Sequence, residues 1–394
     1  MILFFILIIS FFIKFFSINY REKKFILLNV FLILIFVGIQ VYILHVHFGV
    51  YTVGSDAGWY FSNGKNLIRN IPQFNTLNDF FSFFENNNIA SKYILYTIYN
   101  ALCIVEGSEI LSAIFLQLNY GIIIVLFLIT VINYVKKNNF QINYTLLLSV
   151  AFYLYWTMLL NFRDGFITIF IILIVLAYYY ETNLRRKLVK LVFYGILLYF
   201  TRNEFLFILV GILIFESLVY NKFFKFKKCF LIVSLIIIPL IISKILNKSF
   251  IKIVNGNILS LLVNNPIKFL IYFISGIGIE SSWIITKISL FLFIIINFIT
   301  IFLVYPLYVD GIMRKKKDTI TRLGMVASIF LICVFSFYSQ EFGAVQDRVK
   351  NIPFSLVLIY GLFKIDKNIY LKYVVIASSY VFMVVHTLFS LRIL

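Results

Sequence analysis

Long apolar runs alternate with short polar segments along the chain. A helix of about 20 apolar residues is long enough to cross a bilayer. Runs of this kind predict spans near residues 2–19, 25–48, 109–135, 142–161, 165–182, 188–200, 205–220, 229–246, 284–308, 320–338, 353–363 and 374–391. The pattern therefore predicts an all-α, polytopic membrane helix bundle of about 11 to 12 transmembrane helices. We expect a single integral membrane domain over residues 1–394.

Basic residues gather in the breaks between these runs, and this placement predicts a topology. The breaks YREKK, VKKNN, NLRRKLVK, NKFFKFKK, MRKKKD and KIDKNIYLK fall on alternate crossings. Because cytoplasmic loops are rich in lysine and arginine, all six breaks are predicted to face the cytoplasm. Two long segments, 49–108 and 246–283, then lie on the outer side. In the first, the amphipathic patterns LNDFFSFF and SKYILYTIYNAL predict short interfacial helices.

Composition agrees with this class and excludes others. With 62% hydrophobic and 13% charged residues, the chain is too apolar for a water-soluble protein. A formal net charge of +19 would favour a nucleic-acid partner in a soluble protein, but the basic loops account for it here. No CxxC, Walker-type glycine loop or GxSxG pattern is present, so a cysteine metal site, nucleotide-driven transport and serine hydrolysis have no support.

Several charges depart from the topology because they fall on the predicted outer side, among apolar flanks. They are Arg69, the neighbours Arg163 and Asp164 with Gly165 as the expected turn residue, Arg202 with Glu204, and Arg348 with Asp347 and Lys350. The apolar run 191–200 is about half a crossing long, which predicts Arg202 and Glu204 at or near membrane depth. The first two pairs, at Arg163 and at Arg202, have two interpretations: a mutual ion pair that offsets the cost of charge at the membrane, or a substrate site. For the group at Arg348 the alternative to a substrate site is a solvated turn.

The first outer segment adds VYTVGSDAGWYFSNGKNLI, with Asp56, Trp59, Tyr60 and Lys65. Asp56 would suit the cap of a helix that begins near Ala57, and Trp59 and Tyr60 would suit the membrane interface. The functional alternative is a site shared with the outer arginines. A guanidinium binds phosphate oxygens through two parallel hydrogen bonds, and a carboxylate can deprotonate a hydroxyl. A polyprenyl-phosphate-linked sugar meets both requirements.

The order of GSDAGWY, FRDGF, LVKLVFYGILLYFTRNEFLFIL and DRVKNIPFSLVLIYG resembles bacterial surface-polysaccharide polymerases of the Wzy and EpsG type. It is also similar to GT-C glycosyltransferases, whose first outer loop carries a catalytic aspartate. The resemblance is one of layout over most of the chain, carried by short motifs. The chain departs from many GT-C enzymes in having no C-terminal soluble domain. It departs from many O-antigen polymerases in having no large late outer loop.

The resemblance implies a polymerase that joins polyprenyl-diphosphate-linked repeat units of O-antigen, capsule or exopolysaccharide at the outer face of the bacterial cytoplasmic membrane. The alternatives are a GT-C transferase that moves one sugar from a polyprenyl phosphate, and a flippase for lipid-linked glycans. Expected partners are the lipid-linked donor and acceptor, the bilayer and other polysaccharide-assembly proteins, without nucleic acid. No cofactor is expected, and a divalent cation enters only under the GT-C interpretation. The catalytic candidates are Asp56, Asp164 and Glu204, and the substrate-binding candidates are Trp59, Tyr60, Lys65, Arg163, Arg202, Arg348 and Lys350.

Overall fold

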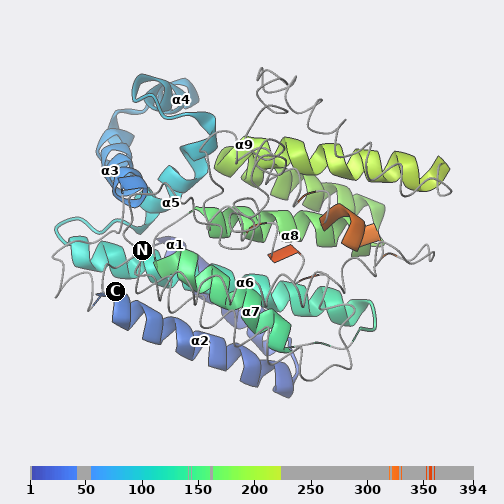
Figure 1. Ribbon diagram of the computed structural model, residues 1–394. Coiled ribbons are helices and arrows are strands. Elements are labelled where there is room, and N and C mark those ends of the chain that lie inside the picture. Colours follow the sequence, from blue (N-terminus) through green and yellow to red (C-terminus); the bar gives the residue numbers. More distant parts are fainter. Residues whose placement is uncertain are drawn as a thin grey trace, which may run out of the picture. The chain divides into compact units, whose positions relative to one another are not determined.

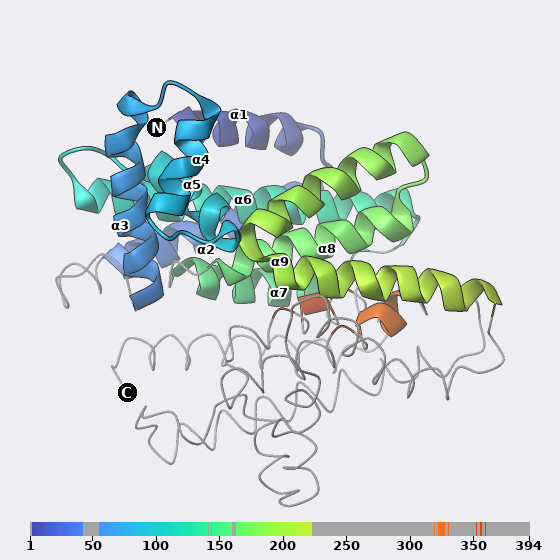
Figure 2. The same ribbon diagram turned by 90° about the horizontal axis from the view of Figure 1, so that it is seen from above.

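The computed structural model (Figures 1 and 2) describes residues 2–41, 55–140, 142, 144–159 and 163–222, and a few positions nearer the C-terminus: 319, 322–327, 330, 352, 355–356 and 359. Its elements in chain order are α1 (Ile2–Phe16), α2 (Tyr20–Val41), α3 (Ser55–Asn70), η2 (Ile71–Gln73), α4 (Leu77–Asn86), η3 (Ser91–Tyr93), α5 (Ile94–Cys103), α6 (Glu109–Lys137), α7 (Tyr144–Leu159), α8 (Asp164–Tyr180) and α9 (Leu184–Lys222). Every one of them is helical. The second long outer segment, 246–283, together with Arg348 and Lys350, lies outside the described residues.

Within the described residues, the predicted all-α class is confirmed, and helices occupy the apolar runs. The predicted span 109–135 is α6, and the predicted span 165–182 is α8. Two helical stretches there, Glu109–Lys137 and Leu184–Ile214, are long and apolar enough to cross a membrane. Two apolar helices are shorter, Leu3–Phe16 and Asp164–Tyr180.

The chain forms two compact units. The first comprises Met1–Tyr144 and Ala151–Asn203, and the second comprises Thr145–Val150 and Glu204–Leu394. In the first unit, α1, α2, α5 and α8 pack against α6. The core face of α6 repeats every four residues, at Tyr120, Ile124, Leu128 and Ile132, which are fully buried. This spacing follows the helical repeat, so one side of α6 supplies the centre of the unit.

The first outer segment folds into α3, α4 and α5, which gather at one end of the long helices (Figures 1 and 2). A small core joins them, made of Leu67, Phe83, Phe84, Ile89 and Ala101. The helices predicted from the two amphipathic patterns are therefore present. α3 approaches α5 closely at Gly64, where an added Cβ would lie 3.0 Å from the Ala101 backbone nitrogen.

Thr76 and Asp79 fix the start of α4 through a capping box. The Asp79 backbone N–H donates to Thr76 Oγ1 over 3.2 Å, and the Thr76 backbone N–H donates to Asp79 Oδ2 over 2.8 Å. These bonds satisfy backbone donors that a helix start leaves without partners. Backbone N–H groups of Thr76 and Asn75 also lower the pKa of Asp79.

Helices α1 and α2 leave large apolar side chains exposed. On α1 these are Phe5, Ile6, Ile9, Phe12, Ile13 and Phe16, and on α2 they include Leu27, Phe31 and Leu34. Soluble monomers rarely expose continuous apolar surface of this extent, because contact with water is unfavourable. The exposed face is of the kind that hydrocarbon covers.

Candidate functional site

The candidate site is organised by a break in α9. The backbone at Arg202 has φ −168° and ψ 95°, so α9 is two helices joined at this residue. The break lies between the predicted spans 188–200 and 205–220. A helix end leaves its last carbonyl groups without intrahelical donors, so these groups need partners elsewhere.

Arg163 supplies one such partner. It occupies the turn before α8, and its Nη1 donates to the Thr201 carbonyl over 3.1 Å and to the Lys92 carbonyl over 2.8 Å. Its guanidinium carbon lies 4.2 Å from the ring centroid of Tyr93. Only 7% of Arg163 is exposed. Arg163 therefore ties together the first outer segment, the start of α8 and the break in α9.

Asp164 is the first residue of α8, and its partner comes from the break in α9. Its Oδ1 lies 3.6 Å from Arg202 Nη1, within ion-pair distance but beyond an ordinary hydrogen bond. Both residues are buried. One interpretation of the sequence was an ion pair between the neighbours Arg163 and Asp164. In the structure, Asp164 pairs instead with Arg202 of α9. Consecutive residues at a helix start point in different directions, which separates the two side chains.

Gly165 has a different role from the expected one. It lies within the first turn of α8, while the turn itself falls at Arg163. A Cβ at position 165 would collide with the hydroxyl groups of Tyr120 and Thr157. Gly165 therefore allows α8 to pack closely against Tyr120 and Thr157.

Rings from the first outer segment surround Arg163. Tyr60 packs edge-on against Tyr96, with centroids 4.9 Å apart, and Trp59 packs against Tyr93 at 5.3 Å. Tyr60 and Tyr96 are buried, whereas Trp59 is 39% exposed. Tyr60 thus supports the packing around Arg163, and Trp59 is the most exposed of these four rings.

The two other candidates of the first outer segment, Asp56 and Lys65, lie on α3. α3 begins at Ser55, so Asp56 lies in its first turn rather than before it. Position 56 precedes Trp59 and Tyr60 by three and four residues, a spacing that puts the three positions on one side of α3. Lys65, in contrast, pairs with Glu109 at the start of α6 and lies over the Phe61 ring. The structure does not bring Lys65 to Arg163.

Glu204 belongs to the second unit, so its predicted grouping with Asp164 stays a prediction. The same holds for Arg348 and Lys350. In the second unit, Glu216 is fully buried and accepts hydrogen bonds from Arg322, with 3.0 Å between Oε2 and Nη2. Both lie inside predicted spans, and neither is among the candidate residues predicted from the sequence. An acidic and a basic residue within otherwise apolar runs were the signal for it.

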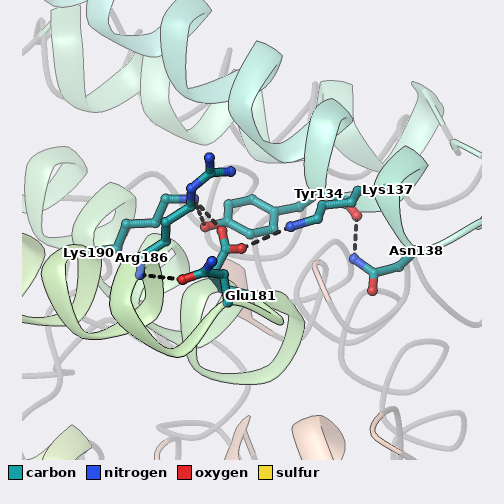
Figure 3. A network of polar contacts seen from close by, with 7 residues as sticks. Tyr134, Lys137, Asn138, Glu181, Arg186 and Lys190 are labelled. Atoms are coloured by element: carbon teal, nitrogen blue, oxygen red, sulfur yellow. Dashed lines mark hydrogen bonds and ion pairs between the residues drawn. The ribbon is translucent and has the colours of Figure 1, made fainter.

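A second group of charges, mostly basic, lies at the C-terminal end of α8, which is a 17-residue helix about 26 Å long. Figure 3 shows Glu181, just after α8, between Lys137 and Lys190. Its two carboxylate oxygens lie 2.9 Å and 2.6 Å from these amines. Hydrogen bonds from Lys190 and then Lys137 lower the pKa of Glu181 to about 2.

The same end also contains an ion pair of Lys136 with Glu22, at 2.8 Å. Three basic breaks predicted to share one side, YREKK, VKKNN and NLRRKLVK, are therefore together in the first unit. Arg163, Asp164 and Arg202 lie at the opposite end, beside the first outer segment. In this unit the two groups of charges therefore lie at opposite ends of α8, and their placement on two sides of a membrane stays a prediction.

No family model, curated protein or solved structure matches the chain.

The arrangement has a definite chemical capacity. Arg163, Asp164 and Arg202 place two guanidinium groups and one carboxylate close together and out of water. A guanidinium group in a low dielectric attracts an anion more strongly than it does in water. Among the described residues, no group of three or more His, Cys, Asp or Glu could hold a metal ion. The groups present suit phosphate binding and proton transfer.

Proposed function

We propose that this protein is a polytopic enzyme of the bacterial cytoplasmic membrane, with the GT-C/Wzy-like bundle of about 11 to 12 transmembrane helices expected from the apolar runs. The exposed apolar faces of α1 and α2 and the two helices long enough to span a bilayer support a membrane location. The gathering of basic breaks at one end supports the orientation, with this end in the cytoplasm.

The reaction is the joining of polyprenyl-diphosphate-linked oligosaccharides at the extracytoplasmic face. The observation that carries this proposal is the buried pair of Arg202 and Asp164 at the helix break, opposite the basic end. A charge pair buried at such a position is costly unless it serves a partner. A diphosphate with a hydrocarbon tail is a partner that reaches both the guanidinium and the lipid.

In the proposed step, a hydroxyl of the acceptor glycan attacks the anomeric carbon of the donor glycan. The bond from this carbon to the diphosphate oxygen breaks, and polyprenyl diphosphate leaves. The hydroxyl proton passes to the Asp164 carboxylate, while Arg202 stabilises the negative charge that develops on the leaving diphosphate. Trp59, partly exposed on α3, offers a ring face on which a sugar can stack.

A single-sugar transferase of the GT-C type is the second candidate. It is favoured by the position of Asp56, in the first turn of a helix of the first outer segment. In this version Asp56 acts as the base, with or without a divalent cation, and the donor is a polyprenyl phosphate. The two candidates differ in product, because one extends a chain by whole repeat units and the other adds one sugar.

Mass spectrometry of polyprenyl-linked glycans distinguishes them. Cells lacking the gene are complemented with the wild type, Arg202→Ala or Asp164→Asn at matched membrane levels. Arg185→Ala is the matched control, because Arg185 is an exposed arginine in the first turn of the same helix α9. We expect both site variants to accumulate complete single repeat units on lipid at the outer face, and the control to resemble the wild type.

Other outcomes count against the polymerase. Truncated repeat units would identify the single-sugar transferase. Complete units trapped at the inner face would identify a flippase. A glycan profile unchanged by deletion would overturn all three functions.

A further inference from the structure

The Glu181 network has more positive charge than its carboxylate neutralises. Glu181 already pairs with Lys137 and Lys190 (Figure 3). Lys14, at the end of α1, donates to Thr130 over 3.3 Å and experiences electrostatic repulsion from Lys190. Arg186 precedes Lys190 by four residues, which puts both on one side of α9. Two lysines thus pair with one carboxylate, and Lys14 and Arg186 add positive charge on the side of Lys190.

Among the described residues of the first unit, no second carboxylate is paired with these four basic residues. Glu22 is the other acidic residue at this end, and it is buried. It pairs with Lys136 and accepts a hydrogen bond from the Asn19 backbone N–H over 3.0 Å. Positive charges held close to one another favour an anionic ligand, because a bound anion lowers their mutual repulsion.

The neighbouring surface is apolar and exposed. Phe16, two residues after Lys14, and Leu184, at the start of α9, are each 70% exposed. Val189, next to Lys190, is 64% exposed. A ligand that covers both kinds of surface needs an anionic head and hydrocarbon chains. A soluble anion would meet only the first requirement.

We propose that Lys14, Lys137, Arg186 and Lys190 form a binding site for the phosphate headgroup of an anionic phospholipid in the leaflet at the basic end. The acyl chains lie along the exposed apolar faces of α1 and the first turns of α9. Glu181 keeps Lys137 and Lys190 at fixed positions and so presents their amines to the headgroup. Juxtamembrane lysines and arginines attract anionic lipids in this manner. This site does not depend on which glycan reaction the protein performs.

The test is native mass spectrometry of the full-length protein in detergent, titrated with phosphatidylglycerol or with phosphatidylcholine. The variants are Lys14→Gln and Arg186→Gln. Arg69→Gln is the control, because Arg69 is an exposed arginine of α3 at the opposite end. We expect the wild type to retain phosphatidylglycerol in preference to phosphatidylcholine. Each site variant should weaken this retention about fivefold, which is the contribution of one basic residue near an anionic surface.

The Arg69→Gln control should retain phosphatidylglycerol as the wild type does, and glycerol 3-phosphate should not displace the lipid. Equal retention of the two lipids by the wild type would overturn the proposal without any variant. A loss in Arg69→Gln as large as in Arg186→Gln would show general electrostatic attraction and would also overturn it. Displacement by glycerol 3-phosphate would show a site for a soluble anion instead.

Discussion

Replacing Arg163 with alanine tests whether this residue positions the site or binds substrate. The substitution leaves the carbonyl groups of Lys92 and Thr201 without their donor, and removes the guanidinium that lies 4.2 Å from the Tyr93 ring centroid. A buried polar group without its partner costs about 1 kcal/mol or more, and a desolvated cation–π contact contributes about 1 kcal/mol. The free energy of unfolding should therefore fall by about 3 kcal/mol.

Denaturant titration of the purified protein in mixed detergent measures this loss. Arg163→Lys is the informative partner variant, because lysine keeps the charge but lacks the planar fork that reaches two carbonyl groups at once. It should lose about half as much stability as Arg163→Ala. Arg69→Ala removes an exposed arginine of α3 and should stay within about 0.5 kcal/mol of the wild type.

The opposite pattern would refute this reasoning. If Arg163→Ala unfolds at the wild-type free energy and yet abolishes glycan transfer, Arg163 contacts the substrate, as the resemblance implied. If it loses about 3 kcal/mol and activity falls only in proportion to folded protein, Arg163 is a positioning residue.

Three further predictions concern local contacts. Because the pKa of Glu181 is lowered to about 2 from its usual 4.5, its ion pairs stabilise the fold above pH 4.5. This contribution is lost as the pH falls toward 2, so Glu181→Gln should lower the free energy of unfolding near pH 7 and have little effect near pH 2. Gly165→Ala should cost about 1 to 3 kcal/mol in the same titration, because its Cβ collides with the Tyr120 hydroxyl. Thr76→Ala should cost about 1 kcal/mol, since it removes the capping box with Asp79, and hydrogen exchange should show faster opening of α4.

The helices of the described residues could be predicted because each depends mainly on the residue types within one continuous segment of the chain. The length of an apolar segment sets a helix such as α6, and a polar break ends it. The helices of the first outer segment were visible for the same reason, since LNDFFSFF repeats its apolar residues with a helical period. The boundary near Arg202 was also predictable, because the run before it is short.

The partners of the charges could not be predicted from the sequence. Arg163 and Asp164 are adjacent, and adjacency suggested a mutual pair as one of two interpretations. The structure instead directs Arg163 to two carbonyl groups, and a carbonyl group is present at every residue, so no residue type marks it. Nothing in the sequence indicates that the backbone carbonyl groups of Lys92 and Thr201 accept hydrogen bonds from an arginine. Tyr93 was visible only as one aromatic residue among many in this chain.

These contacts separate the roles of the two arginines. A break inside a buried stretch of helix leaves carbonyl groups that water cannot reach, and a buried carbonyl without a donor is costly. Arg163 donates to such a carbonyl, at Thr201, and so makes the break at Arg202 tolerable. Arg202, whose backbone forms the break, faces Asp164 rather than a carbonyl end. The residue required by the backbone is therefore Arg163, and the pair on which we expect phosphate chemistry to depend is Arg202 with Asp164.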